Sequence, residues 1–136
     1  MNPLLIFAIS FLAFFAFCSK SNEQPATGLS STWKETDYYY SIGGPVIWKK
    51  TEPGNKEVIR FEEDNVFYSS VHPEFNRYVL EEIDGQTSMA RIKLFKSGTI
   101  DTTHWFLKTV TPDTIEIAFS GCIEGCGKRF VSVGVE

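Results

Sequence analysis

The strongest constraint on the fold of this chain is an alternation of apolar and polar residues, which is clearest over residues 58–70. Ile59 and Phe61 lie two positions apart, as do Phe67 and Ser69, and the polar run Glu-Glu-Asp-Asn separates the two pairs. A period of two is typical of a β-strand with one buried face, and the Asp-Asn pair tolerates the positive φ angles of a tight turn. This stretch therefore predicts a β-hairpin.

The same alternation recurs along the chain after residue 30, and seven further strands are expected at residues 32–40, 46–48, 75–83, 90–94, 100–110, 115–119 and 129–133. Residues 75–83 also show helical spacing, but the Asp-Gly pair that follows them favours a strand that enters a tight turn. No long helix is expected. The pattern predicts an all-β fold, an antiparallel up-and-down β-barrel of about eight to nine strands, because closure leaves no strand edge unpaired.

The first residues of the chain have a different character. Residues 3–17 carry no charge and are almost wholly apolar, which is too short a run for a comfortable membrane span but suits the apolar region of a secretory signal. The run ends at Cys18, which is followed at once by Ser-Lys-Ser-Asn-Glu, and in this it resembles a bacterial lipoprotein signal. The resemblance implies that Cys18 becomes the lipidated N-terminus. An ordinary signal or an uncleaved anchor helix is the alternative.

This organisation predicts three segments: a signal peptide at residues 1–17, the lipidated cysteine with a flexible tether at residues 18–30, and a barrel domain at residues 31–136. The tether is rich in Ser, Gln, Pro, Thr and Gly and shows no apolar periodicity, as is typical of flexible linkers. The expected localisation is the cell envelope, with the membrane contacted through the lipid anchor on a periplasmic or surface face of the outer membrane.

The barrel region resembles the small lipocalin-like lipoproteins of Gram-negative envelopes, over roughly residues 31–135. The resemblance rests on an early tryptophan, the hairpin spacing Ile-x-Phe-x-x-Asp-x-x-Phe, a middle Asp-Gly turn and a late Asp-Thr-Ile-Glu-Ile strand. These are Trp33; Ile59, Phe61, Asp64 and Phe67; residues 84–85; and residues 113–117. The resemblance implies a barrel of eight or so strands with an apolar interior, and it supplies no catalytic residues.

The most distinctive local motif is the pair Cys122 and Cys126, which three residues separate and glycines flank. Such a pair suits a structural disulfide, a redox pair or half of a metal site. If Cys18 is lipidated, these two cysteines remain in an exported domain, and export to an oxidising compartment favours the disulfide. Reduced thiols are the other alternative.

Other catalytic or cofactor chemistry has little support in the sequence. His72 and His104 lack the spacing of zinc ligands, and the acidic runs at residues 62–64 and 81–82 suit solvated turns. The sequence holds no nucleophile elbow and no phosphate loop. We therefore expect no enzyme activity and no cofactor. The 13 basic residues are scattered and the net charge is −4, so nucleic acid is not an expected partner.

The aromatic residues are the candidate ligand contacts. Six are predicted to face a ligand: Trp33, Trp48, Phe61, Phe67, Trp105 and Phe106. Tyr39 and Phe119 belong to the same wider set. An eight-stranded barrel is either just hollow or just filled, so two functions are expected. A hollow barrel would bind a small apolar or amphipathic ligand. A filled barrel would be a structural lipoprotein that contacts another envelope protein through residues 41–45 or 121–127. An enzyme that uses Cys122, Cys126 and His104 is the least favoured hypothesis.

Overall fold

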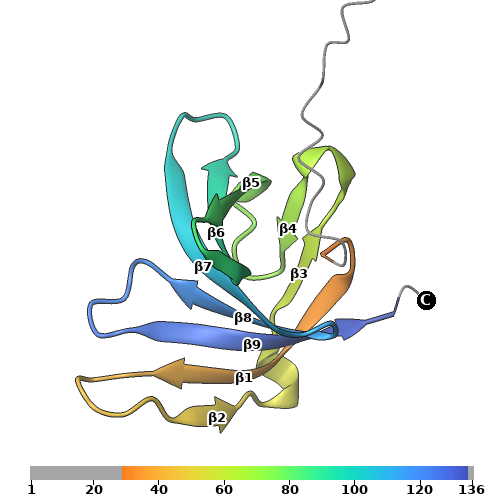
Figure 1. Ribbon diagram of the computed structural model, residues 1–136. Coiled ribbons are helices and arrows are strands. Elements are labelled where there is room, and N and C mark those ends of the chain that lie inside the picture. Colours follow the sequence, from red (N-terminus) through yellow and green to blue (C-terminus); the bar gives the residue numbers. More distant parts are fainter. Residues whose placement is uncertain (1–28, 135–136) are drawn as a thin grey trace, which may run out of the picture.

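The described structure consists mainly of nine β-strands joined in one antiparallel sheet (Figure 1). The structure is a computed structural model, and it describes residues 29–134. The strands are β1 Thr32–Tyr40, β2 Trp48–Lys50, β3 Val58–Phe61, β4 Phe67–Ser69, β5 Phe75–Ile83, β6 Gln86–Lys96, β7 Thr102–Thr111, β8 Thr114–Phe119 and β9 Cys126–Val133. Two 3-10 turns, η1 Pro53–Asn55 and η2 Glu63–Asn65, lie between strands.

The sheet follows the chain from strand to strand and then returns to its start. From β5 to β9 each strand pairs with the next, and β9 pairs with β1. Both β2 and β3 pair with the same edge of β1, β3 near its beginning and β2 near its end. A bridge between Val66 and Arg77 joins the two ends of the sheet at β4 and β5. The predicted all-β, up-and-down barrel is thus confirmed.

The β3–β4 hairpin forms as its alternation predicts. Ile59 pairs with Ser69 and Phe61 with Phe67, so the two pairs of inward residues face each other across the ladder. The turn between them places Asp64 at φ 58° and Asn65 at φ 60°, both in the left-handed region. These short polar side chains tolerate that region better than most residues do.

Some strand ends differ from the prediction. Strand β2 begins at Trp48 rather than at residue 46, and Val46 and Ile47 are exposed in the preceding loop. Strand β6 is longer than expected, and β7 begins two residues late because Ile100 lies exposed in the turn that follows Gly98. Alternation shows which residues can face inward, but a pattern of two or three apolar residues does not fix where pairing starts.

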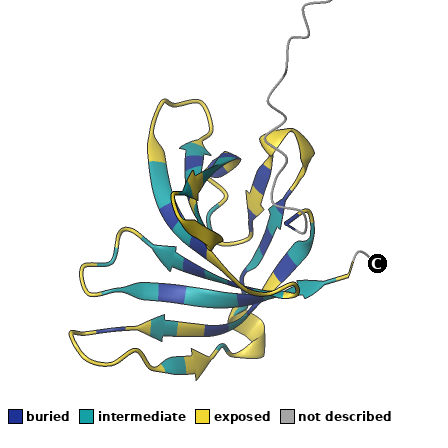
Figure 2. Ribbon diagram, in the orientation of Figure 1, coloured by how far each residue is buried: buried dark blue, intermediate teal, exposed yellow. Residues whose placement is uncertain are grey.

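The core consists of the inward-facing side chains of the strands, together with one residue from the segment before β1 (Figure 2). Its members are Leu29, Trp33, Ile59, Phe61, Phe67, Phe75, Tyr78, Ile92, Leu94, Trp105, Leu107, Ile115, Ile117 and Phe130. Leu29 is buried, and its carbonyl oxygen accepts a hydrogen bond of 3.1 Å from the Trp33 indole. The packed residues therefore begin at least two positions before residue 31.

Aromatic rings fill the interior between β4, β5, β7 and β8. The Trp105 ring makes edge contacts with Phe119 at 4.8 Å, Phe67 at 5.9 Å and Phe75 at 6.1 Å between ring centroids. Edge-to-face packing of this kind adds stability beyond the burial of apolar area. This part of the barrel is filled rather than hollow.

Candidate functional site

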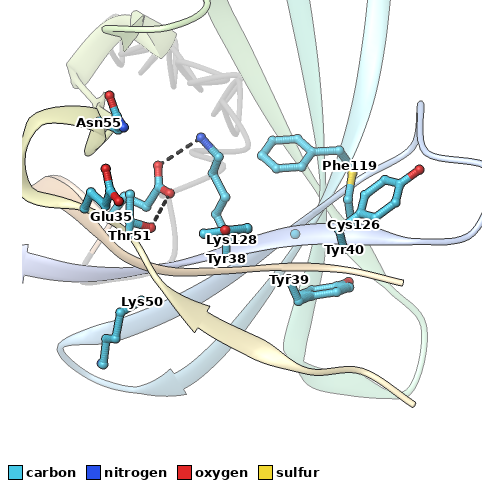
Figure 3. Close-up of a pocket in the computed structure, with 12 residues that line it drawn as sticks. Glu35, Tyr38, Tyr39, Tyr40, Lys50, Thr51, Asn55, Phe119, Cys126 and Lys128 are labelled. Carbon is cyan, nitrogen blue, oxygen red and sulfur yellow. Dashed lines mark hydrogen bonds and ion pairs between the residues drawn. The ribbon is translucent and has the colours of Figure 1, made fainter. Parts of the chain in front are cut away.

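An open pocket of about 610 Å³ lies where β1, β8 and β9 meet the segment after β2 (Figure 3). Three consecutive tyrosines of β1 line it, with Phe119 from β8 and Cys126, Gly127 and Lys128 from β9. Glu35 lies at its inner end, and Lys50, Thr51, Glu52 and Asn55 complete the wall. In Figure 1 the β1–β2 and β8–β9 hairpins extend together away from the other strands. Residues of both hairpins line the pocket.

A bulge in β1 brings two of the tyrosines to the pocket. The pairing of β1 with β9 shifts between Glu35 and Asp37, so that Glu35 is opposite Phe130 while Tyr38 is opposite Lys128. Lys128 and Phe130 are two residues apart and share a face of β9, so Tyr38 takes the same side of β1 as Glu35. Tyr38 and Tyr40 are nevertheless 39% and 64% exposed. Both side chains therefore stay partly open to solvent at the pocket.

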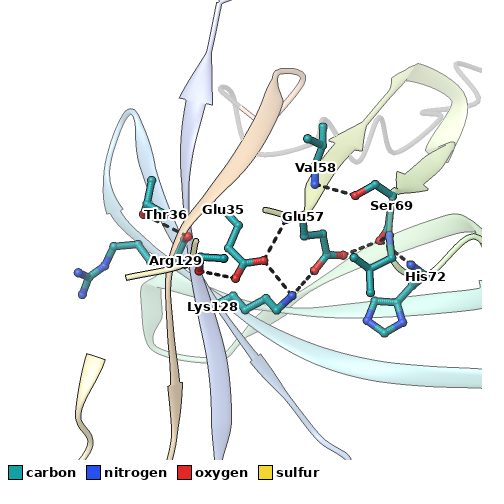
Figure 4. A network of polar contacts seen from close by, with 11 residues as sticks. Glu35, Thr36, Glu57, Val58, Ser69, His72, Lys128 and Arg129 are labelled. Carbon is teal, nitrogen blue, oxygen red and sulfur yellow. Dashed lines mark hydrogen bonds and ion pairs between the residues drawn. The ribbon is translucent and has the colours of Figure 1, made fainter. Parts of the chain in front are cut away.

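The inner end of the pocket is a buried group of charges around Lys128 (Figure 4). The ammonium of Lys128 lies 2.9 Å from a carboxylate oxygen of Glu35 and 2.8 Å from one of Glu57. Glu35 and Glu57 are only 2% and 0% exposed. The Thr51 hydroxyl donates to Glu35 at 2.6 Å, and the Glu57 amide donates to Glu35 at 3.1 Å. We call Glu35, Glu57 and Lys128 the buried triad.

Ser69 connects the buried triad to the loop between β4 and β5. Its hydroxyl donates to Glu57, and its oxygen accepts the amide hydrogens of Val71 at 3.1 Å and His72 at 2.8 Å. The His72 ring in turn lies 5.3 Å from the Trp105 ring. The charged end of the pocket and the aromatic core are therefore linked through one short loop.

The charge of the buried triad follows from its hydrogen bonds. Burial by itself would lower the pKa of Lys128, but hydrogen bonds to Glu57 and Glu35 and the charges of both raise that pKa above its ordinary value of 10.5. The carboxylate oxygens of Glu35 and Glu57 accept hydrogen bonds from Thr51, the Glu57 amide, Ser69 and Lys128. Two carboxylates and one ammonium give the buried triad a net charge of −1.

The outer rim of the pocket is held by the pair Cys122 and Cys126. The structure joins Cys122 and Cys126 in a disulfide, with 5.8 Å between their Cα atoms. The Ser41 amide donates to the Gly125 carbonyl at 2.9 Å, which ties the β1–β2 loop to this small ring. Two loops distant in sequence thus form one rim beside the pocket.

The six aromatic residues predicted as ligand contacts lie elsewhere in the barrel. Trp33, Phe61, Phe67 and Trp105 belong to the buried core. Trp48 packs under the Arg129 guanidinium at 4.3 Å, and Phe106 lies near Arg91 at 5.9 Å. Tyr39 and Phe119 do line the pocket. As ligand contacts the six residues stay predictions.

Sequence reasoning missed the buried triad because no motif connects its members. Glu57 is 22 residues from Glu35 and 71 from Lys128. A signal was present in the alternation: Glu35 follows Trp33 by two positions, Glu57 precedes Ile59 by two, and Lys128 precedes Phe130 by two. A charged residue in register with core residues is therefore the pattern that could have found this site.

The other predicted polar residues do not gather into a site. His72 and His104 are not brought together with the cysteines, and among residues 29–134 no group of three or more His, Cys, Asp or Glu side chains could hold a metal ion. Glu62 pairs with Arg60 at 3.1 Å and Glu81 with Arg91 at 3.5 Å, both near the surface. The predicted lipidation site Cys18, the predicted signal peptide and the predicted tether up to residue 28 lie outside the described residues.

No helix within residues 29–134 is both long enough and apolar enough to cross a membrane. Comparisons of the chain with protein-family models, with curated proteins and with solved structures gave no match. Function therefore has to be inferred from the pocket and its surroundings.

Proposed function

We propose that the protein is a non-enzymatic binding module that holds a small amphipathic ligand in the pocket between β1, β8 and β9. The observation that carries this proposal is the contrast between the two parts of the pocket. Its outer part offers the uncovered faces of Tyr38 and Tyr40, and its inner end offers the polar atoms of the buried triad. Apolar walls with a few convergent polar groups are characteristic of small-molecule sites, and a volume of about 610 Å³ is within their usual range.

The position of the ligand follows from which part of the barrel interior the side chains already fill. Between β4, β5, β7 and β8 the interior holds the packed rings around Trp105, so we place the ligand outside this cluster. Phe119 is the point of contact between this packed cluster and the pocket, since it touches Trp105 and also lines the pocket wall. The ligand would therefore lie at the open end of the barrel, against a rigid aromatic wall.

The cellular setting belongs to the same proposal. The apolar run that ends at Cys18 supports a lipid anchor, and the likeness of residues 31–135 to lipocalin-like lipoproteins supports a place in a Gram-negative envelope. A barrel held beside a bilayer by a lipidated Cys18 would meet amphipathic molecules at high local concentration. Mass spectrometry of the mature N-terminus tests the anchor, and a first residue after Cys18 without acyl chains would contradict it.

Native mass spectrometry of the full chain, purified from its own membranes, tests ligand binding. We expect a retained small molecule that is lost in the variant Tyr38→Ala/Tyr40→Ala. The matched control is Tyr68→Ala, because Tyr68 is 42% exposed and contacts Arg60 away from the pocket. Equal retention in the pocket variant and the control, or a wild-type protein that never carries a small molecule, would contradict the proposal.

A second function is favoured by a separate observation, the apolar rim beside the pocket. Ile42 and Ile47 in the β1–β2 loop and Ile123 in the β8–β9 loop are exposed, and the Ser41–Gly125 hydrogen bond holds the two loops together. Exposed aliphatic side chains gathered in this way suit contact with another protein. This supports the alternative of a structural or interaction lipoprotein that meets an envelope protein.

A photo-crosslinking residue placed at position 123 tests this second function in intact cells. We expect one defined crosslinked species. The matched control is position 100, because Ile100 is also fully exposed but lies in the β6–β7 turn, away from the rim. A species that forms equally from both positions, or from neither, would contradict a specific contact at the rim.

A further inference from the structure

We infer that the pocket selects amphiphiles whose head group is neutral and carries a hydroxyl or carbonyl oxygen, and that it disfavours amphiphiles with an anionic or a cationic head. This inference rests on the proposed ligand binding, because it specifies the ligand class of the same pocket. It is carried by the hydrogen bonds of Lys128 and by the net negative charge of the buried triad.

Lys128 has a donor to spare. An ammonium group carries three N–H donors, and the Lys128 ammonium has two carboxylate partners, Glu35 and Glu57. No third acceptor within hydrogen-bond distance is found for it in the described part of the chain. Lys128 also lines the pocket, so its remaining donor is available to an oxygen atom of a bound molecule. A ligand head that accepts a hydrogen bond is therefore favoured.

The charge of the buried triad decides which acceptor is preferred. A carboxylate head would accept from Lys128, but it would bring a third negative charge close to Glu35 and Glu57, where burial weakens the screening by water. A hydroxyl or carbonyl oxygen makes the same hydrogen bond without that repulsion. Anionic heads are therefore disfavoured relative to neutral ones.

A cationic head is disfavoured for a local reason. To reach a carboxylate oxygen of Glu35 from the pocket, an amine would have to lie beside the Lys128 ammonium, which is already 2.9 Å from that carboxylate. Two ammonium groups at such a distance repel each other. A hydroxyl group avoids this conflict, because it accepts from Lys128 and can donate its own hydrogen to Glu35.

Three amphiphiles with the same chain length test the inference on the full-length protein held in phosphatidylcholine nanodiscs. Titration calorimetry would compare 1-monodecanoylglycerol, decanoate and decylamine at neutral pH. We expect the neutral compound to bind at least about tenfold more tightly than either charged compound. Decanoate or decylamine that binds as tightly as the neutral compound would overturn the inference, while leaving the proposed function in place.

A charge-neutral variant makes the test specific to the buried triad. In Glu35→Gln the net charge becomes zero, and we expect the preference for the neutral compound over decanoate to shrink by about fivefold or more. We expect Glu57→Gln to reduce the preference in the same way, and this variant replaces Glu35→Gln if Glu35→Gln folds poorly. Glu52→Gln is the matched control, because Glu52 also lines the pocket but is exposed to solvent. An unchanged preference in folded Glu35→Gln and Glu57→Gln would overturn the inference.

The two proposals fail in different ways. If none of the three amphiphiles binds the folded wild-type chain, the proposed function fails and the selectivity fails with it. If all three bind but head-group charge has no effect, only the selectivity fails. The variants separate these outcomes because they change the charge at the inner end and leave the tyrosine walls intact.

Discussion

The Tyr39 ring lies directly over Gly127 across the β1–β9 pair, where the two residues are partners in the ladder. A Cβ atom at Gly127 would come within 2.4 Å of the Tyr39 ring and 2.7 Å of the Ile117 carbonyl oxygen. Tyr39 is held from its other side by Trp48, whose ring centroid is 4.7 Å away. The absence of a side chain at Gly127 is thus what lets the tyrosine cover the sheet beside the pocket.

Gly127→Ala is therefore expected to destabilise the fold by about 1–3 kcal/mol, the usual effect of forcing extra volume into a packed place. Trp48 limits how far the Tyr39 ring can move, and the Ile117 carbonyl belongs to the backbone of β8 and cannot turn aside. Urea denaturation followed by tryptophan fluorescence measures the change. Gly121→Ala is the control, because a Cβ at Gly121 meets nothing within 4 Å. Equal stability of the two variants would show that Gly127 is not confined in this way.

Leu29→Ala tests whether the folded domain includes residues before β1. Leu29 is buried in the core and its carbonyl holds the Trp33 indole. Removing a buried leucine side chain commonly costs about 2–5 kcal/mol. We expect a loss in this range by thermal or urea denaturation, against almost no loss for Ser30→Ala, whose side chain is exposed. Similar values for both would mean that the core ends at β1.

High pH is expected to weaken the fold through Lys128. Because its pKa is raised in the folded state, the folded protein keeps a proton that the unfolded chain loses above 10.5. The stabilisation is complete below that pH and disappears as the pH rises through the raised pKa. Burial also raises the pKa of Tyr39 and Tyr78 above 10.0, which acts in the same direction. The urea midpoint should fall between about pH 10 and pH 12.

The variant Tyr39→Phe/Tyr78→Phe isolates the contribution of Lys128 to the loss of stability at high pH. Without those two hydroxyls, an alkaline loss of stability should remain, because the ion pairs of Lys128 with Glu35 and Glu57 are still present. Circular dichroism during urea titration at each pH gives the measurement. A midpoint that stays level in this variant across the alkaline range would contradict a stabilising role for the charged lysine.

Loss of the disulfide is expected to have a modest effect. The ring between Cys122 and Cys126 is short, and the chain-entropy relation for a loop of about five residues gives roughly 2 kcal/mol. We expect Cys122→Ala/Cys126→Ala to lose about this much in urea denaturation, and reduced wild type to behave like the variant. The prediction would be contradicted if the denatured, unreduced domain had two free thiols and if adding a reductant left its stability unchanged.

Much of the barrel could be predicted from the sequence because its strands bury one face each. In β3 and β4 the apolar residues at every second position specify the register, and the Asp-Asn turn specifies the connection. The segment 75–83, whose spacing also suits a helix, forms a strand as predicted. Where a strand is short and exposed, as in β2, the pattern is weak, and its observed start depends on pairing with β1.

The pocket could not be predicted, for two physical reasons. The bulge in β1 moves Tyr38 to the inner face, and strict alternation from Trp33 would have placed it outside. The hydrogen bonds of the buried triad join β1, β9 and the residue before β3, so they exist only once the barrel has closed. Alternation marks Glu35, Glu57 and Lys128 as inward-facing residues, but it does not show that the three meet one another.

The way in which the sheet closes has a consequence for its motion. In the described chain β4 and β5 are joined at the Val66–Arg77 bridge, whereas β5 and β6 share a ladder over most of their length. Separating β4 from β5 breaks fewer hydrogen bonds than separating two strands that share a long ladder. Fluctuations that open the barrel therefore begin between β4 and β5. Amide protons along this seam would exchange with solvent first, and the two bared strand edges would be the place where a second chain could add a strand.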